Sequence, residues 1–140
     1  TSPVTEEEWQ AYYHFRWQVL REPWTQPEGS EKDELENNAI HRMIVNHENH
    51  VIATGRIHFP NDHSVQIRYM AVSPEHERRG LGSLILSSLE RTAINNKKQS
   101  IFLNARENAV AFYEKHGYKL DKPSHLLYGE IQHYLMTKKL

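Results

Sequence analysis

The sequence contains no cysteine and no long apolar run. Without cysteine, both disulfides and a thiol nucleophile are excluded. No stretch approaches the roughly eighteen apolar residues of a membrane-spanning helix. No signal peptide is recognisable either, so we expect a cytoplasmic protein.

The chain also lacks an excess of either charge, with 17 Lys and Arg against 18 Asp and Glu and a net charge of -1. No Lys/Arg-rich run is present, so a nucleic-acid partner is not expected. A Gly-Lys-Ser/Thr motif is absent as well, which weighs against an ATP- or NAD-binding domain. The length of 140 residues predicts a single domain over 1–140 with one core.

Apolar periodicity and turn residues divide the chain into helices and strands. Thr5 stands three residues before Glu8 in a capping-box pattern, and this predicts an amphipathic helix over 5–21. Residues 22–36 are rich in proline and acidic residues and predict a surface loop. The predicted strands cover 40–45, 51–59, 65–72, 100–103 and 132–137, and the other predicted helices cover 80–96 and 108–116.

This order of elements predicts a fold of the α/β class, of the α+β type. We expect a mixed, mostly antiparallel sheet with helices on both faces. Its central parallel strand pair would be joined by the helix over 80–96. A cofactor is expected at the carboxyl ends of that pair.

The segment Val72-Ser-Pro-Glu-His-Glu-Arg-Arg-Gly-Leu-Gly-Ser83 is the most informative part of the chain. An apolar strand runs into Gly80 and Gly82, and an apolar helix follows at once. Glycines allow the backbone to turn sharply and to approach a ligand. The free N–H groups of the helix's first turn then favour an anion, so the segment predicts a pyrophosphate site.

Three segments in this order resemble the GNAT superfamily of N-acetyltransferases. They are Tyr69-Met-Ala-Val-Ser-Pro74, then Arg79-Gly-Leu-Gly-Ser83, then Ala109-Val-Ala-Phe-Tyr-Glu-Lys-His-Gly-Tyr118. The likeness covers about residues 40–140 and implies the GNAT fold and acetyl-CoA as cosubstrate. Phe15-Arg-Trp-Gln-Val-Leu20, followed by an acidic loop and Ala39-Ile-His41, also resembles a branch of small bacterial-type members.

The resemblance implies which residues bind acetyl-CoA. The backbone of Met70, Ala71 and Val72 would pair with the amides of the pantetheine arm. The pyrophosphate would bind the loop made by Arg78, Arg79, Gly80, Leu81, Gly82 and Ser83. The family's loop normally opens with Gln or Arg, but Glu77 stands at that position here. Its carboxylate would repel phosphate, so we expect Glu77 to turn outward.

The resemblance also places Tyr113 where family members protonate the CoA sulfur, a role that suits a phenol. Alternatively, Phe112 and Tyr113 form only the apolar face of a short helix. Asn104 and Asn108 could hydrogen-bond the pantetheine amides or cap that helix. The family's usual Asn in this segment falls on Arg106, so neither asparagine matches it.

A general base is not singled out by the sequence. The candidates are Glu34, Glu36, His41 and His133, and a water chain could serve instead. We select His133 and Glu34 beside Tyr113 as the predicted catalytic residues. The His47-Glu-Asn-His50 turn lacks metal-ligand spacing and a third ligand, so no metal site is expected.

The charge of the acceptor is left open. The acidic stretch Glu28–Glu36 would attract a cationic amine if it lines the cleft, whereas Arg16 and Arg21 would favour an acceptor with a carboxylate. The sequence therefore predicts an enzyme that moves an acetyl group from acetyl-CoA to an amine of a small molecule or peptide by direct attack in a ternary complex. The alternative is a non-catalytic acyl-CoA sensor or interaction module. A homodimer is conceivable but is not selected by any residue.

Overall fold

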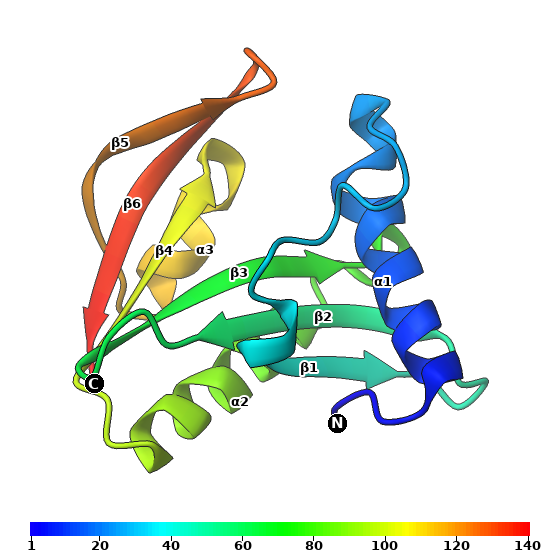
Figure 1. Ribbon diagram of the computed structural model, residues 1–140. Helices are drawn as coiled ribbons and strands as arrows, with labels where there is room; N and C mark the ends of the chain where they lie inside the picture. Colours follow the sequence, from blue (N-terminus) through cyan, green and yellow to red (C-terminus); the bar gives the residue numbers. More distant parts are fainter.

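The computed structural model describes all residues from 1 to 140, and Figure 1 shows the arrangement of its helices and strands. The helices are α1 (Glu6–Leu20), α2 (Leu81–Asn95) and α3 (Val110–Lys115), and the strands are β1 (Ile40–Val45), β2 (Val51–His58), β3 (Ser64–Val72), β4 (Ser100–Arg106), β5 (Lys119–Leu127) and β6 (Ile131–Lys139). Short 3₁₀ turns lie at Glu22–Trp24, Glu36–Asn38, Pro74–His76 and Glu107–Ala109.

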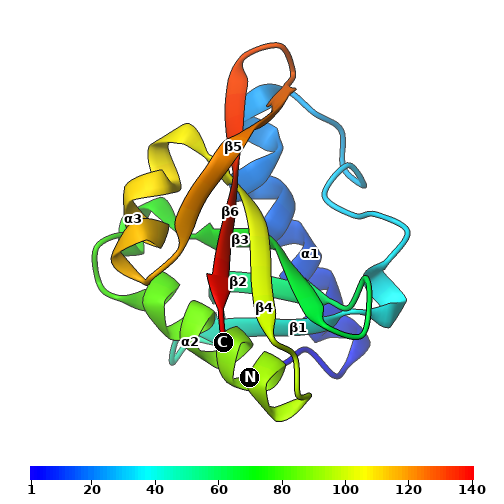
Figure 2. The same ribbon diagram turned by 90° about the vertical axis from the view of Figure 1, so that its left-hand side faces the viewer.

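The strands form one sheet in the order β1-β2-β3-β4-β6-β5. Strands β3 and β4 run parallel, and every other neighbouring pair is antiparallel. Helix α2 makes the crossover that a parallel pair requires. Helix α1 packs against β2 and β3 on one face, and α2 and α3 lie on the other (Figures 1 and 2). The predicted fold class and the predicted parallel pair are confirmed.

The larger apolar core fills the space between α2, α3 and the sheet. Helix α2 contributes Ile85, Leu86, Leu89 and Ala93 to it, at the i, i+3, i+4 spacing that keeps side chains on one face. A smaller cluster lies under α1 and consists of Phe15, Leu20, Tyr69 and Ala71. These two clusters hold α1 and α2 on opposite faces of the sheet.

Strand β5 is not predicted by the sequence. Its side chains are exposed from Lys119 to Leu126, so no alternation of apolar and polar residues marks it as a strand. It lies at the edge of the sheet beside β6 and contains Pro123. An edge strand accommodates proline because one side of its backbone needs no partner.

A β-bulge in β3 changes which side chains face α1. Thr54 pairs with Ala71 and Arg56 pairs with Arg68, so Tyr69 and Met70 together lie opposite the single residue Gly55. Tyr69 has a φ of 58°, in the left-handed region. The extra residue turns the Tyr69 side chain to the α1 face, whereas Val65 and Ile67 belong to the α2 core.

The bulge also lies where β3 and β4 separate. Their pairing runs from Ser64 with Ser100 to Ile67 with Leu103 and then stops. Both strands continue, β3 to Val72 and β4 to Arg106. Their carboxyl halves therefore diverge, as the spread between β3 and β4 in Figure 1 shows.

Candidate active site

A cavity of about 600 Å³ lies where β3 and β4 diverge. This volume is in the range of small-molecule sites. Its walls come from elements far apart in the sequence: the end of α1 (Val19, Leu20, Arg21), β3 (66–72), β4 (103–106), Tyr113 of α3, His125 and Leu127 of β5, and His133 of β6. The cavity lies at the carboxyl ends of the parallel pair, where the sequence predicts a cofactor.

The predicted pantetheine strip forms one wall. Met70, Ala71 and Val72 all line the cavity. Beyond Ile67 this edge of β3 has no β4 partner, so its backbone N–H and C=O groups are available to another extended chain. A pantetheine arm carries amides that can pair with such an edge.

The predicted phosphate loop has the backbone geometry of an anion cradle. Arg78 and Gly80 have φ values of 64° and 79°, and α2 begins at Leu81 with no side chain capping its first turn. The free first-turn amides and the positive end of the helix favour a phosphate. Glu77 is exposed and lines the cavity, whereas the residues of the predicted loop, Arg78 to Ser83, are not in the cavity wall.

Glycine at position 82 allows α2 and α3 to approach each other. A Cβ at this position would lie 3.2 Å from Cζ of Phe112. The hydroxyl of Ser83 donates to Nε2 of His116 at 2.8 Å, because Nδ1 of that ring donates to the Phe112 carbonyl. The first turn of α2 is thus hydrogen-bonded to the end of α3, the helix that carries Tyr113.

Tyr113 of α3 is a buried residue of the cavity wall. The residue is 6 % exposed, lines the cavity, and its hydroxyl has no hydrogen-bond partner in the chain. Burial raises the pKa of Tyr113, so the phenol keeps its proton at neutral pH. Its ring packs edge-on against Phe112 and Tyr118. The ring of Tyr113 therefore packs in the apolar core, while its hydroxyl still has a proton that it can donate.

Asn104 and Asn108 both line the cavity. Neither caps a helix, because neither the Glu107–Ala109 turn nor α3 has a side-chain cap. Their amides are therefore free for a ligand. Arg106, at the position of the family's usual Asn, also lines the cavity and donates to the Leu20 carbonyl at 3.3 Å.

His133 is the base candidate that the structure brings to the cavity. Its Nδ1 lies 3.0 Å from the Ile131 carbonyl, which can only accept, so Nδ1 carries the proton and Nε2 keeps its lone pair. Burial, and then the nearby His125 and Arg106, lower the pKa of His133. The ring therefore stays neutral near pH 7, the form that can take up a proton.

The other base candidates lie elsewhere. Glu34 is exposed and is not in the cavity wall. His41 uses both ring nitrogens, since Nε2 donates to the Glu36 carbonyl and Nδ1 accepts from Tyr12, each at 2.9 Å. Neither His41 nor Glu36 lines the cavity.

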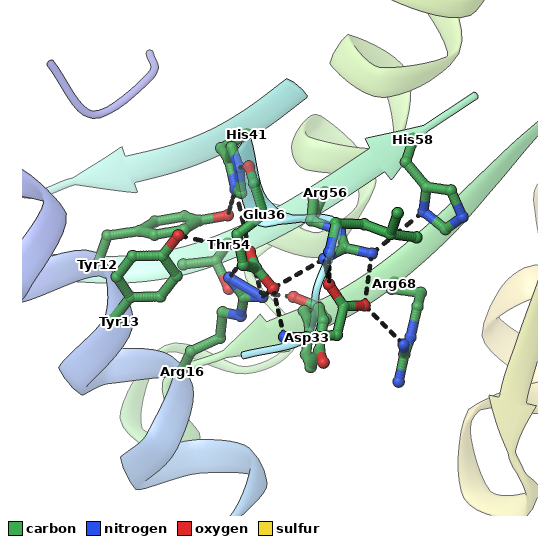
Figure 3. Close-up of polar contacts among 12 residues, drawn as sticks. Tyr12, Tyr13, Arg16, Asp33, Glu36, His41, Thr54, Arg56, His58 and Arg68 are labelled. Carbon is green, nitrogen blue, oxygen red and sulfur yellow. Dashed lines mark hydrogen bonds and ion pairs between the residues drawn. The ribbon is translucent and has the colours of Figure 1, made fainter. Parts of the chain in front are cut away.

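Two acidic residues of the loop, Asp33 and Glu36, are paired with arginines, as Figure 3 shows. Arg56 binds both oxygens of Asp33 at 2.6 and 2.9 Å, and Arg68 binds Asp33 at 2.8 Å. Arg16 binds both oxygens of Glu36 at 3.0 Å. Burial alone would raise the pKa of Asp33, but the bonds from Arg56 hold it below its usual range. This loop does not line the cavity, which corrects the idea that it attracts a cationic acceptor.

His47 and His50 are exposed in the β1–β2 turn, with ring nitrogens 3.7 and 3.9 Å from the Glu48 carboxylate. The chain holds no group of three side chains that could ligate a metal ion.

Comparison with known proteins identifies the family and the fold. The family model described as "Acetyltransferase (GNAT) family" matches residues 7–118. The chain belongs to this family. The GNAT chain is 31 % identical over 133 residues to the uncharacterized N-acetyltransferase YjcF of Bacillus subtilis (strain 168), covering 95 % of this chain and 94 % of that one.

Solved structures share the GNAT fold. The aminoglycoside 6'-N-acetyltransferase complexed with coenzyme A superposes with a TM-score of 0.80 at 13 % identity, over 96 % of this chain and 92 % of that one. An acyl-CoA N-acyltransferase from Pseudomonas aeruginosa gives a TM-score of 0.78 at 20 % identity, with the same coverage of 96 % and 92 %.

The predicted family, the acetyl-CoA-dependent N-acetyltransferase activity and acetyl-CoA as cosubstrate are therefore confirmed. None of the protein's helices has both the length and the apolar character that crossing a bilayer requires.

Proposed function

We propose that this GNAT enzyme acetylates an amine of a small molecule or peptide by direct attack within a ternary complex, with Tyr113 as the acid and His133 as the base. The observation that carries the proposal is their placement. An unpartnered phenol from α3 and an imidazole with a free Nε2 from β6 reach one cavity. Glu34 has no part in this assignment, because it lies outside the cavity wall.

The proposed reaction needs no covalent enzyme intermediate. The lone pair of the neutral amine attacks the thioester carbonyl carbon, and the C–S bond breaks as the amide forms. The amine's proton passes to Nε2 of His133, directly or through water, and the thiolate takes the proton of the Tyr113 hydroxyl. Proton exchange with water restores both side chains, and the products are an N-acetylated amine and CoA.

The first test follows thiol release from acetyl-CoA with a panel of amines. The chain contains no cysteine, so every thiol detected comes from CoA. Release that depends on the amine supports the proposal. Acetyl-CoA binding without release across the whole panel would instead favour the acyl-CoA sensor.

The second test replaces Tyr113 by Phe. The loss of a general acid is expected to lower kcat by roughly 10²- to 10⁴-fold while the Kd for acetyl-CoA stays nearly unchanged. Tyr118→Phe is the matched control, because this hydroxyl belongs to the same aromatic cluster but donates to Glu90 outside the cavity. Equal turnover in Tyr113→Phe and the parent enzyme would remove Tyr113 from the mechanism.

A further inference from the structure

The α1 side of the cavity has an excess of positive charge. Arg106 of β4 pairs with His133 of β6, so both side chains lie on the same face of the sheet. Arg106 donates to the carbonyl of Leu20 at the end of α1, which identifies this face as the α1 face. Arg21, the C-cap residue that directly follows Leu20, also lines the cavity.

Neither Arg21 nor Arg106 has a carboxylate partner. Arg21 donates from Nε to the Ser30 carbonyl at 3.0 Å and from Nη1 to the Leu20 carbonyl at 3.2 Å. Arg106 makes its one bond to that same Leu20 carbonyl, through Nη2. The two guanidinium groups are thus held close together by a shared neutral acceptor.

Both guanidinium groups keep free N–H groups that ligands can reach. The side-chain nitrogens that are buried without a partner belong to Arg16, Arg56 and His76, and none belongs to Arg21 or Arg106. Arg21 as a whole is only 8 % exposed. Burial and then the charge of Arg21 lower the pKa of Arg106, which agrees with two nearby cations that lack a counter-ion.

The carboxylates of the chain do not compensate this charge. Glu77 is the one acidic residue in the cavity wall, and it directly follows the Pro74–His76 turn, before the predicted phosphate loop. Asp33 and Glu36 are bound by Arg16, Arg56 and Arg68. Arg68 also lines the cavity with a side chain that is 40 % exposed, but its charge is paired with Asp33.

Buried cations without a partner are costly, and a ligand anion can supply the missing charge. We propose that the acceptor amine carries an anionic group, a carboxylate or a phosphate, which Arg21 and Arg106 bind while the amine faces His133. This inference rests on the proposed transfer reaction and names its substrate class. Guanidinium groups bind both anions through paired N–H donors.

The position of the base limits the size of such an acceptor. Residues that pair directly across antiparallel strands have Cα atoms about 5 Å apart, so Arg106 and His133 are close neighbours. We therefore expect the amine and the anionic group of the acceptor to be separated by few bonds, as in an amino acid. A polyamine would place positive charges against Arg21 and Arg106.

The test compares acceptors matched in length and in amine pKa. Amino acids and O-phosphoethanolamine carry an anionic group besides the amine, simple alkylamines carry no second charged group, and spermidine carries further amines. We expect kcat/KM to be at least roughly tenfold higher for amino acids or for O-phosphoethanolamine than for the alkylamines. The anionic acceptor with the higher value distinguishes carboxylate from phosphate.

Arg106→Gln should lower the ratio of kcat/KM for the anionic acceptor to kcat/KM for the alkylamine by roughly 10- to 100-fold. Arg21→Gln should do the same, with thermal unfolding confirming that the variant is folded. Arg91→Gln, an exposed position on α2, is the matched control and should leave this ratio unchanged.

Equal or higher activity with spermidine or alkylamines would overturn the inference while leaving amine acetylation intact. Absence of thiol release with every amine would overturn the proposed reaction. The anion site would then be tested by calorimetry with an N-acetyl amino acid in the presence of CoA. Binding that is lost in Arg106→Gln would support the anion site, and no binding to the parent protein would overturn it.

Discussion

At the scale of single residues, Gly82 leaves the space beside Phe112 that a side chain would fill. It lies in the first turn of α2, where a Cβ would be 3.2 Å from Cζ and 3.4 Å from Cε1 of Phe112. Phe112 precedes Tyr113 in α3, and the two rings are in edge contact. A larger residue at 82 would therefore push α2 and α3 apart at the phosphate loop.

Gly82→Val is expected to weaken acetyl-CoA binding more than catalysis. Overpacking at this contact should displace the first-turn amides and raise the Kd by roughly tenfold, equivalent to about 1.4 kcal/mol. Calorimetric titration with acetyl-CoA measures this change, and kcat at saturating acetyl-CoA should change little. Ser87→Val on the exposed side of the same helix is the control. An unchanged Kd in Gly82→Val would show that the loop tolerates a side chain.

At the scale of elements, α1 is fixed at both ends. Its first turn has a capping box, in which the Thr5 hydroxyl accepts from the Glu8 N–H at 3.1 Å and the Glu8 carboxylate accepts from the Thr5 N–H at 2.9 Å. Its last residues, Val19 to Arg21, enter the cavity wall. The cap stabilises the helix at the end that lies away from the chemistry.

Thr5→Ala should therefore lower stability without changing catalysis. Loss of an N-cap hydroxyl costs about 1 kcal/mol of unfolding free energy. Urea unfolding would measure the change, and kcat/KM should match that of the parent enzyme. Thr5→Ser keeps the hydroxyl and should retain most of the stability. If Thr5→Ser and Thr5→Ala lost the same amount, the cap would not be the cause.

At the scale of the whole molecule, buried charges connect α1, the loop over 22–39, β2 and β3. Arg16 and Arg56 are completely buried, and their partners Asp33 and Glu36 come from the loop (Figure 3). His41 joins this network in its neutral form. Burial, reinforced by the charges of both arginines, lowers the pKa of His41 from 6.5 to about 4, although the Glu36 carbonyl and Asp33 act in the opposite direction.

This buried imidazole makes stability depend on pH. Between pH 6.5 and about 4, the unfolded chain binds a proton at His41 that the folded chain does not. The unfolding free energy should therefore fall as the pH falls through this window. His58 and His133, whose pKa values burial also lowers, should add to the trend.

His41→Gln is expected to make that fall shallower. Urea unfolding at several pH values between 7 and 4 gives the slope, and the exposed His47→Gln is the control that should keep the parent slope. Equal slopes for His41→Gln and the parent protein would show that His41 does not titrate as described.

The sequence by itself determined the elements that depend on local signals. The capping box marks the start of α1, and the glycine pair and apolar spacing mark α2 within one residue of its observed ends. Helical and strand periods arise from contacts a few residues apart, so they can be read from short windows. The order of these elements is sufficient for the fold class, and the resemblance carried by three motif segments implied the family and acetyl-CoA.

Only the tertiary structure decided β5, the bulge at Tyr69, and the meeting of His133, Arg21 and Arg106 in one cavity wall. Strand β5 has no apolar alternation of its own and depends on pairing with β6. Arg56 and Asp33 lie 23 residues apart, and Arg106 meets Leu20 across 86 residues. Folding decides which oppositely charged group comes within bonding distance of a given charge. The number of residues between two charged residues in the sequence does not predict that pairing.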